Sequence, residues 1–310
     1  MSAIRLDRLT KRFGPLTAVD RLSLEVGEGE LFGLVGPDGA GKTTAMRLLT
    51  AIMTPDDGDA WVDGCHVVDE AEKVKERIGY MSQRFGLYAD LTVSENIDFY
   101  ADVYNEPRRG RGEKIDRLLE FSNLTPFRRR LAGNLSGGMK QKLGLVCALI
   151  HTPRILFLDE PTNGVDPVSR RDFWRILHQL TQEGVTIFVS TAYLDEADRC
   201  RRVGLMHRGR LLACDSPRNA KRSMKDAILE IRTDEPRRAA AALRERLPDA
   251  SVGLFGDRLH VVAREPERTT GEARAALAEA GLNVLGLRTI EPSLEDVFIS
   301  MLREDELILP

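Results

Sequence analysis

The sequence predicts an α/β core with an antiparallel β edge and a helical insert, followed by a small C-terminal α+β domain. Apolar runs at residues 31–35 and 155–158 end in glycines or carboxylates, as buried parallel strands do. A mostly helical stretch, at about residues 91–150, separates them. After about residue 220, short strands alternate with alanine-rich helices, which is typical of a separate small domain.

The apolar run at residues 31–35 stops at a glycine loop, and a helix-forming pattern follows. The loop has the spacing G-x-x-x-x-G-K-[ST], in which backbone N–H groups and a helix N-terminus hold a polyphosphate. A chance glycine turn does not explain both flanks. The sequence therefore predicts a P-loop NTPase core that binds a nucleoside triphosphate. The expected contacts with this nucleotide are Gly36, Pro37, Asp38, Gly39, Ala40, Gly41, Lys42, Thr43 and Thr44.

Within this loop two side chains have separate expected roles. Lys42 is expected to contact the β- and γ-phosphates, and the Thr43 hydroxyl is expected to bind Mg²⁺.

Composition restricts the class of protein. The 310 residues suffice for one large and one small domain, and the net charge of −3 gives no basic field for nucleic acid. The four cysteines are scattered without a C-x-x-C, which predicts a reduced cytosolic protein without structural zinc. No apolar run reaches the length of a membrane span, and residues 1–7 lack the apolar centre of a signal peptide. We expect contact with a membrane only through a partner.

The first strands carry a candidate base-binding residue. Residues 4–9 and 22–26 alternate between apolar and polar, which predicts two edge strands joined by a loop at residues 11–19. Phe13 in this loop suits an ordinary core position. Because it precedes a phosphate loop, we expect its ring to stack on adenine, with Val19 as an apolar neighbour.

Gln83 follows an apolar run at residues 78–81, at the expected end of a strand. A loop glutamine commonly faces solvent. At this position its amide can instead reach the metal ion or the attacking water. Thr92 and Glu95 then form a capping-box pattern that starts a helix.

A second anion cradle is expected at Ser136, Gly137 and Gly138, before a long helix with periodic apolar residues. An ordinary Ser-Gly-Gly helix cap is the alternative. One chain rarely needs two cradles for one triphosphate, so the economical arrangement is two chains head to tail. Each ATP then lies between the phosphate loop of one chain and the Ser136 cradle of the other. Gln141 is assigned to the same cradle.

Asp159 and Glu160 end an all-apolar strand, where parallel strands present ligand-binding residues. Asp159 suits Mg²⁺, directly or in the outer shell, and Glu160 is placed to polarise the water that attacks the γ-phosphate. The expected catalytic residues are Glu160, Gln83 and Lys42, and the expected metal contacts are Thr43, Gln83 and Asp159. Asp166 either caps the next helix or reaches a partner chain.

Taken together, the phosphate loop, Gln83, the run Leu-Ser-Gly-Gly-Met at 135–139 and the strand at 156–161 resemble the ATP-binding subunit of ATP-binding cassette (ABC) transporters. The match covers about the first two-thirds of the chain. It implies an ATPase that dimerises on ATP, with itself or with a second cassette, and so moves membrane-spanning subunits. It also implies a cytoplasmic location, peripheral on the cell membrane, with residues 83–91 docking the membrane partner.

The sequence departs from this family at one position. The family usually places a histidine on the γ-phosphate after the strand at 185–189, and here Ala192 occupies that place. A methyl group can neither donate to phosphate nor orient water. Either Glu160 alone carries slow hydrolysis, or the site mainly binds ATP beside an intact cassette of an unequal pair. The other functions considered are a nucleotide-gated regulatory cassette with weak turnover and a soluble, non-transport ABC ATPase.

The expected domains are an ABC ATP-binding domain at residues 1–220 and an accessory α+β domain at residues 221–310. The second holds strands at 226–233 and 283–290, a hairpin around 255–257 and two alanine-rich helices. Its ending, Pro-Ser-Leu-Glu-Asp-Val-Phe at 292–298, is similar to the tail of drug-export ABC subunits of the daunorubicin-resistance type. This similarity implies export.

Overall fold

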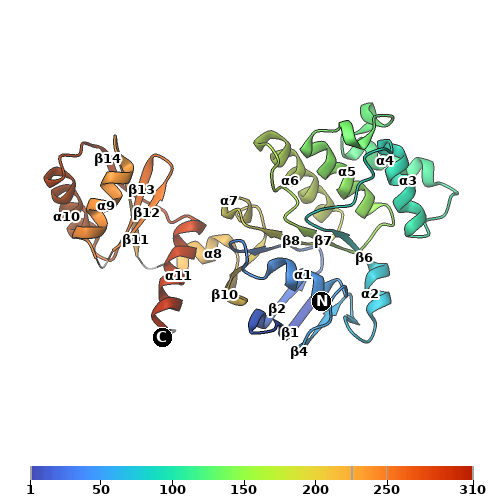
Figure 1. The fold of residues 1–310 in the computed structure, drawn as a ribbon, viewed down its shortest axis with the longest axis horizontal. Helices are drawn as coiled ribbons and strands as arrows, with labels where there is room; N and C mark the ends of the chain where they lie inside the picture. The colour runs from blue at the N-terminus through green and yellow to red at the C-terminus, as the bar shows by residue number, and fades with distance from the viewer. Residues whose placement is uncertain (1, 225, 249, 309–310) are drawn as a thin grey trace. The chain divides into compact units, whose positions relative to one another are not determined.

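The computed structural model describes residues 2–308 apart from 225 and 249, and side chains as far as residue 302. The chain forms two compact units that divide between Cys214 and Asp215. Helix α8 (Pro217–Ser223) belongs to the second unit, so the boundary expected at residue 220 falls inside a helix. Figure 1 shows the elements of each unit in chain order. The predicted α/β class, with an antiparallel subdomain and a C-terminal α+β region, is confirmed.

The larger sheet of the first unit has the order β10-β9-β3-β8-β7-β6. Its strands are β3 (Leu31–Val35), β6 (Ile78–Met81), β7 (Ile155–Asp159), β8 (Thr186–Thr191), β9 (Arg202–His207) and β10 (Arg210–Asp215). The pairs β3–β8, β3–β9, β7–β8 and β6–β7 are parallel. The carboxyl ends of these strands therefore meet at one edge, and Asp159 there pairs in register with Ser190.

A second sheet of the first unit has the order β2-β1-β4-β5. Its strands are β1 (Ser2–Phe13), β2 (Leu16–Gly27), β4 (Asp57–Val62) and β5 (Cys65–His66). The prediction of a loop at residues 11–19 is wrong. The hairpin continues until Phe13 pairs with Leu16, so only Gly14 and Pro15 connect the strands. Phe13 therefore stands at the tip of a long ribbon.

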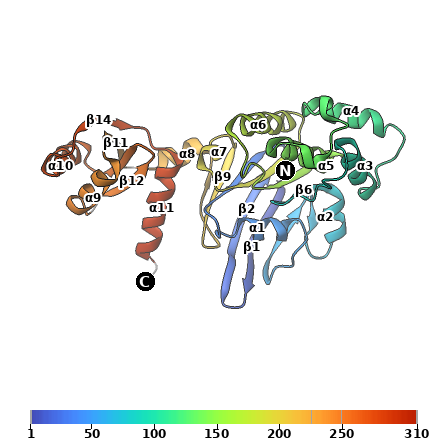
Figure 2. The same cartoon turned by 45° about the horizontal axis from the view of Figure 1, so that its top comes forward.

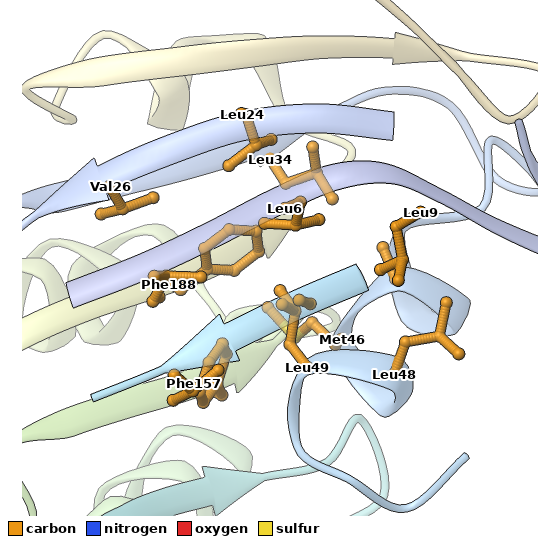
Figure 3. Packing of buried hydrophobic residues seen from close by; sticks show 14 of the residues in the cluster. Leu6, Leu9, Leu24, Val26, Leu34, Met46, Leu48, Leu49, Phe157 and Phe188 are labelled. Atoms are coloured by element: carbon orange, nitrogen blue, oxygen red, sulfur yellow. The ribbon is translucent and has the colours of Figure 1, made fainter. Parts of the chain in front are cut away.

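The core of the first unit lies between this hairpin, the parallel sheet and α1 (Lys42–Leu49) (Figure 3). The hairpin supplies Leu6, Leu9, Leu24 and Val26, the parallel sheet supplies Leu34, Phe157 and Phe188, and α1 supplies Met46, Leu48 and Leu49. Because α1 packs into this core through apolar contacts, the core fixes the position of the helix that follows the phosphate loop.

The helical insert gathers α3 (Val93–Val103), α4 (Arg111–Phe121) and α5 (Gly137–Leu149) on one side of the first unit (Figure 2). The capping box at Thr92 and Glu95 is confirmed. The other helices of this unit are α2 (Ala71–Arg77), α6 (Pro167–Gln182), α7 (Leu194–Ala197) and two 3₁₀ turns (Thr125–Phe127, Ala132–Asn134). In the described part of the chain, none of the helices combines the length and apolarity that crossing a membrane requires.

The second unit is an antiparallel sheet of order β12-β13-β11-β14 with helices. Its elements are β11 (Ala227–Thr233), α9 (Pro236–Arg246), β12 (Ser251–Phe255), β13 (Arg258–Ala263), α10 (Pro266–Glu279), β14 (Val284–Ile290) and α11 (Leu294–Ile308). Leu229 and Ile231 pack in one core with apolar residues of α9 and α10. Glu230, between them in the strand, pairs instead with Arg258 and Arg288.

Candidate nucleotide site

Close backbone approaches shape the loop between β3 and α1. A Cβ on Gly36 would lie 2.1 Å from the Met206 carbonyl oxygen, and one on Gly41 would lie 2.1 Å from the Ala18 carbonyl oxygen. Gly41 also has a φ of 104°. Since α1 starts at Lys42, the N–H groups of its first turn have no partner within the helix. The loop therefore offers backbone donors to an anion.

Lys42, the first residue of α1, is 3% exposed. Its Nζ donates to the carbonyl oxygens of Gly36 (2.7 Å) and Pro37 (3.0 Å) and lies 3.2 Å from Glu160 Oε1. An ammonium group has three donors, and here all three have acceptors. The positive charge is thus held beside the carboxylate that is expected to act on water.

Asp159 is 1% exposed and has one satisfied and one orphaned oxygen. Oδ1 accepts from the hydroxyls of Ser190 (2.7 Å) and Thr43 (3.1 Å), whereas Oδ2 has no hydrogen-bond partner among the described residues. Burial raises the pKa of this carboxyl above its usual value.

An orphaned carboxylate oxygen beside a threonine hydroxyl fits a hard cation such as Mg²⁺. Among the described residues no three His, Cys, Asp or Glu side chains group into a self-contained metal site. A nucleotide-bound Mg²⁺ needs only one or two protein ligands, because phosphates and water supply the others. Thr43 and Asp159 are therefore suitable protein ligands for it.

Glu160 follows β7 with a positive φ of 49°, which is uncommon for a residue with a side chain. Its backbone N–H donates to the Ser190 hydroxyl (3.0 Å) and lies 3.2 Å from the Ser190 carbonyl oxygen, so β8 holds this conformation. Its carboxylate Oε2 accepts from Gln83 Nε2 (2.9 Å) and from Asn163 Nδ2 (3.3 Å). The structure thus brings together Lys42, Gln83, Asp159 and Glu160.

Ala192 follows β8 and lines a cleft of about 190 Å³ together with Asp38, Glu160, Asn163 and Tyr193. This volume is ample for water molecules next to the Glu160 carboxylate. His207 lies half-buried at the end of β9 and is not among the residues that line this cleft.

The walls of this cleft are tied together by Glu196, which is 1% exposed. Its carboxylate accepts from the hydroxyls of Thr162 (2.6 Å) and Thr191 (2.8 Å) and pairs with Arg170 (3.3 Å). The Arg170 guanidinium lies 4.3 Å from the centre of the Tyr193 ring. The loop after Glu160 and the loop that holds Ala192 therefore share one buried anchor.

The Ser136 cradle is a separate helix start. Ser136 caps α5 by accepting from the Met139 N–H (3.3 Å). A Cβ on Gly138 would lie 2.4 Å from Ser169 Cβ, so Gly138 allows α5 to approach α6 closely, whereas a Cβ on Gly137 would come no closer than 3.9 Å to any described atom. Gln141 lines a groove of about 280 Å³ that Gln83 also lines.

The structure also places the three remaining expected nucleotide contacts. Phe13 is 46% exposed, and Lys11 Nζ lies 5.9 Å from its ring centre. Val19 is fully buried in the core, so its side chain offers no apolar surface to adenine, and that expectation is corrected. Asp166 caps α6 by accepting from the N–H groups of Val168 (3.1 Å) and Ser169 (2.9 Å), the first of its two alternatives.

Sequence reasoning missed two residues of the site. Ser190 is a polar residue near the end of an apolar strand, and Asn163 is an amide three positions after Glu160. Only the register of β7 with β8 shows that Ser190 supports both Asp159 and Glu160.

Comparisons with known proteins show which proteins the chain resembles. A family model described as "ABC transporter" matches residues 19–163. The chain is 42% identical over 304 residues to a probable multidrug ABC transporter ATP-binding protein, YbhF, of Escherichia coli K12, covering 97% of this chain and 52% of YbhF. It thus spans about half the length of that relative. It is 33% identical to the daunorubicin resistance ATP-binding protein DrrA2 of Streptomyces coeruleorubidus, covering 96% of this chain and 94% of DrrA2.

Solved structures resemble the first unit. An ATP-binding subunit of an ABC transporter aligns with a TM-score of 0.65 at 26% identity, covering 72% of this chain and 93% of that one. A dimeric ATP-binding cassette in a post-hydrolysis state, bound to ADP and Pi, aligns with a TM-score of 0.63 at 25% identity, covering 69% of this chain and 98% of that one.

Proposed function

The chain belongs to the ABC transporter family, as an ATP-binding subunit, and from this premise we propose that it energises a membrane exporter through ATP-driven dimerisation of cassettes and ATP hydrolysis. The observation that carries the proposal is the position of Glu160 Oε1, 3.2 Å from the phosphate-loop Lys42. The proposed general base, Glu160, is thereby in contact with the proposed phosphate-binding cation, Lys42.

Each residue near the phosphate loop has a distinct role in the proposed reaction. The loop N–H groups and Lys42 bind the β- and γ-phosphates, and Phe13 stacks on the base. Thr43 and Asp159 would hold Mg²⁺, which would supply positive charge beside the phosphate oxygens. Glu160 accepts a proton from water as the water oxygen bonds to the γ-phosphorus, and the bond from that phosphorus to the bridging oxygen breaks to release ADP.

The other half of each site comes from a second cassette, either another copy of this chain or a related subunit. The α5 N-terminus of that cassette would close over the γ-phosphate, since it offers a hydroxyl, N–H groups and a positive helix end. The residues involved would be Ser136, Gly137, Gly138 and Gln141. The dimeric cassette bound to ADP and Pi supports this arrangement by similarity.

Export is supported by the relatives, one named for multidrug transport and one for daunorubicin resistance. We propose that the membrane-spanning subunits dock at the groove of about 280 Å³ beside Gln83. The lining of this groove includes Arg84, Phe85 and Lys140. The chain would then lie on the cytoplasmic face of the membrane, in contact with it only through that partner. Recovery of an integral membrane protein with the tagged chain tests this assignment, and recovery of the chain from cytosol without one contradicts it.

The variant Glu160→Gln tests the proposed reaction, because glutamine keeps the shape of the side chain but accepts no proton at neutral pH. We expect ATP turnover to fall by about 10²-fold or more while ATP binding persists. Unchanged turnover would show that Glu160 is not the general base.

A second candidate function, a nucleotide-gated regulatory cassette within an unequal pair, is favoured by Ala192.

A further inference from the structure

The Glu160 carboxylate has two differently occupied oxygens. Oε1 faces Lys42 at 3.2 Å. Oε2 accepts two amide hydrogen bonds, from Gln83 at 2.9 Å and from Asn163 at 3.3 Å. Two donors on one oxygen fix both the rotation of the carboxylate and the direction of its second oxygen.

We propose that Asn163 is a positioning residue for hydrolysis: with Gln83 it holds Glu160 Oε2, so that Oε1 is aimed at the attacking water. This inference rests on the proposed function. When the Lys42 ammonium group leaves Glu160 to bind a phosphate of ATP, Glu160 Oε1 becomes free to accept a hydrogen bond from water. Asn163 thus donates a hydrogen bond that orients the base, and the methyl group of Ala192 can donate none.

Hydrogen bonds hold the backbone around Asn163 in place. The Asn163 N–H donates to the Glu160 carbonyl oxygen (3.2 Å), which closes a turn directly after the base. Thr162, the preceding residue, is 1% exposed and donates to the buried Glu196. The amide of Asn163 is therefore supported by the same anchor that holds the loop of Ala192.

Asn163 also lines the cleft of about 190 Å³ next to Ala192 and Glu160. The side chain thus borders the space in which a water molecule next to the base would lie. Misplacing a catalytic group by a fraction of an ångström slows a reaction without weakening the binding of its substrate.

The test is steady-state ATP hydrolysis by the full chain, with kcat and KM for ATP measured separately. For Asn163→Ala we expect kcat to fall about tenfold, with KM and the melting temperature little changed. Asn163→Gln keeps an amide donor and should recover part of the loss. Asn283→Ala is the matched control, because it removes an exposed asparagine whose amide donates to a carboxylate, Asp234, at 3.2 Å in the second unit. Its turnover should equal that of the wild type.

Four outcomes overturn the inference. Asn163→Ala could retain the wild-type kcat, or lose activity only in proportion to a loss of ATP binding or stability. Asn163→Gln could be as slow as Asn163→Ala. The wild-type chain could also hydrolyse no ATP, which would refute the proposed function as well. If Glu160→Gln stops turnover while Asn163→Ala does not slow it, only the role of Asn163 fails.

Discussion

Gln83 and Glu160 are 77 positions apart in the chain, yet the Gln83 amide donates to Glu160 Oε2 at 2.9 Å. The contact exists because β6 and β7 are parallel neighbours whose carboxyl ends meet at one edge of the sheet. Gln83 also lines the groove that we assign to the membrane partner. A partner that moves Gln83 would therefore change the orientation of the Glu160 carboxylate directly.

Gly138 and Gly137 provide a matched pair for testing the packing of the α5 N-terminus. Gly138→Ala places a methyl group 2.4 Å from Ser169 Cβ, so we expect a loss of about 1–3 kcal/mol of unfolding free energy. Gly137→Ala meets no atom closer than 3.9 Å and should leave stability unchanged or slightly raised. Urea denaturation of the two variants measures the difference. Equal stabilities would show that α5 and α6 do not approach as closely as described.

Ala192→His tests whether the site is impaired without a histidine. Because Gln83 and Asn163 already hold Glu160, we expect turnover to rise by less than about threefold. In the Asn163→Ala background the same histidine should recover part of the lost turnover, since the cleft beside Ala192 gives it access to Glu160. A rise of about 10²-fold or more in the wild-type background, which is the contribution of a general acid or base, would instead indicate an impaired cassette with a regulatory role.

Burial of Asp159 makes a prediction about pH. Because the folded state raises the pKa of this carboxyl, the folded protein keeps the proton to a higher pH than the unfolded chain does. The stability of the wild type relative to Asp159→Asn should therefore fall as the pH rises from about 4, the ordinary value, and level off above the raised pKa. Thermal melts of both nucleotide-free proteins across pH measure this difference. A difference that is constant with pH would contradict it.

Much of the site could be predicted from local sequence, because a phosphate loop, a capping box and a strand ending in carboxylates each depend on neighbouring residues. The structure adds what strand pairing decides. The sequence predicts a hairpin loop that is longer than the observed one, because the pairing of residues 11–13 with residues 16–19 is a contact between strands and not a local pattern. Val19 was misjudged because burial depends on the opposite layer of the core. Asn163 was missed because the turn after Glu160, and not spacing, brings its amide to the carboxylate.

In the proposed mechanism, one chain holds half of each working site. The measurement that tests this most directly is the molar mass in solution of the Glu160→Gln variant, in which we expect turnover to be blocked, with and without Mg·ATP. We predict a shift from one chain to two on addition of Mg·ATP, with itself or with a co-purifying cassette. A second variant that also carries Lys42→Ala should stay monomeric. If saturating Mg·ATP leaves Glu160→Gln as a single chain in both settings, the two-cassette account is contradicted.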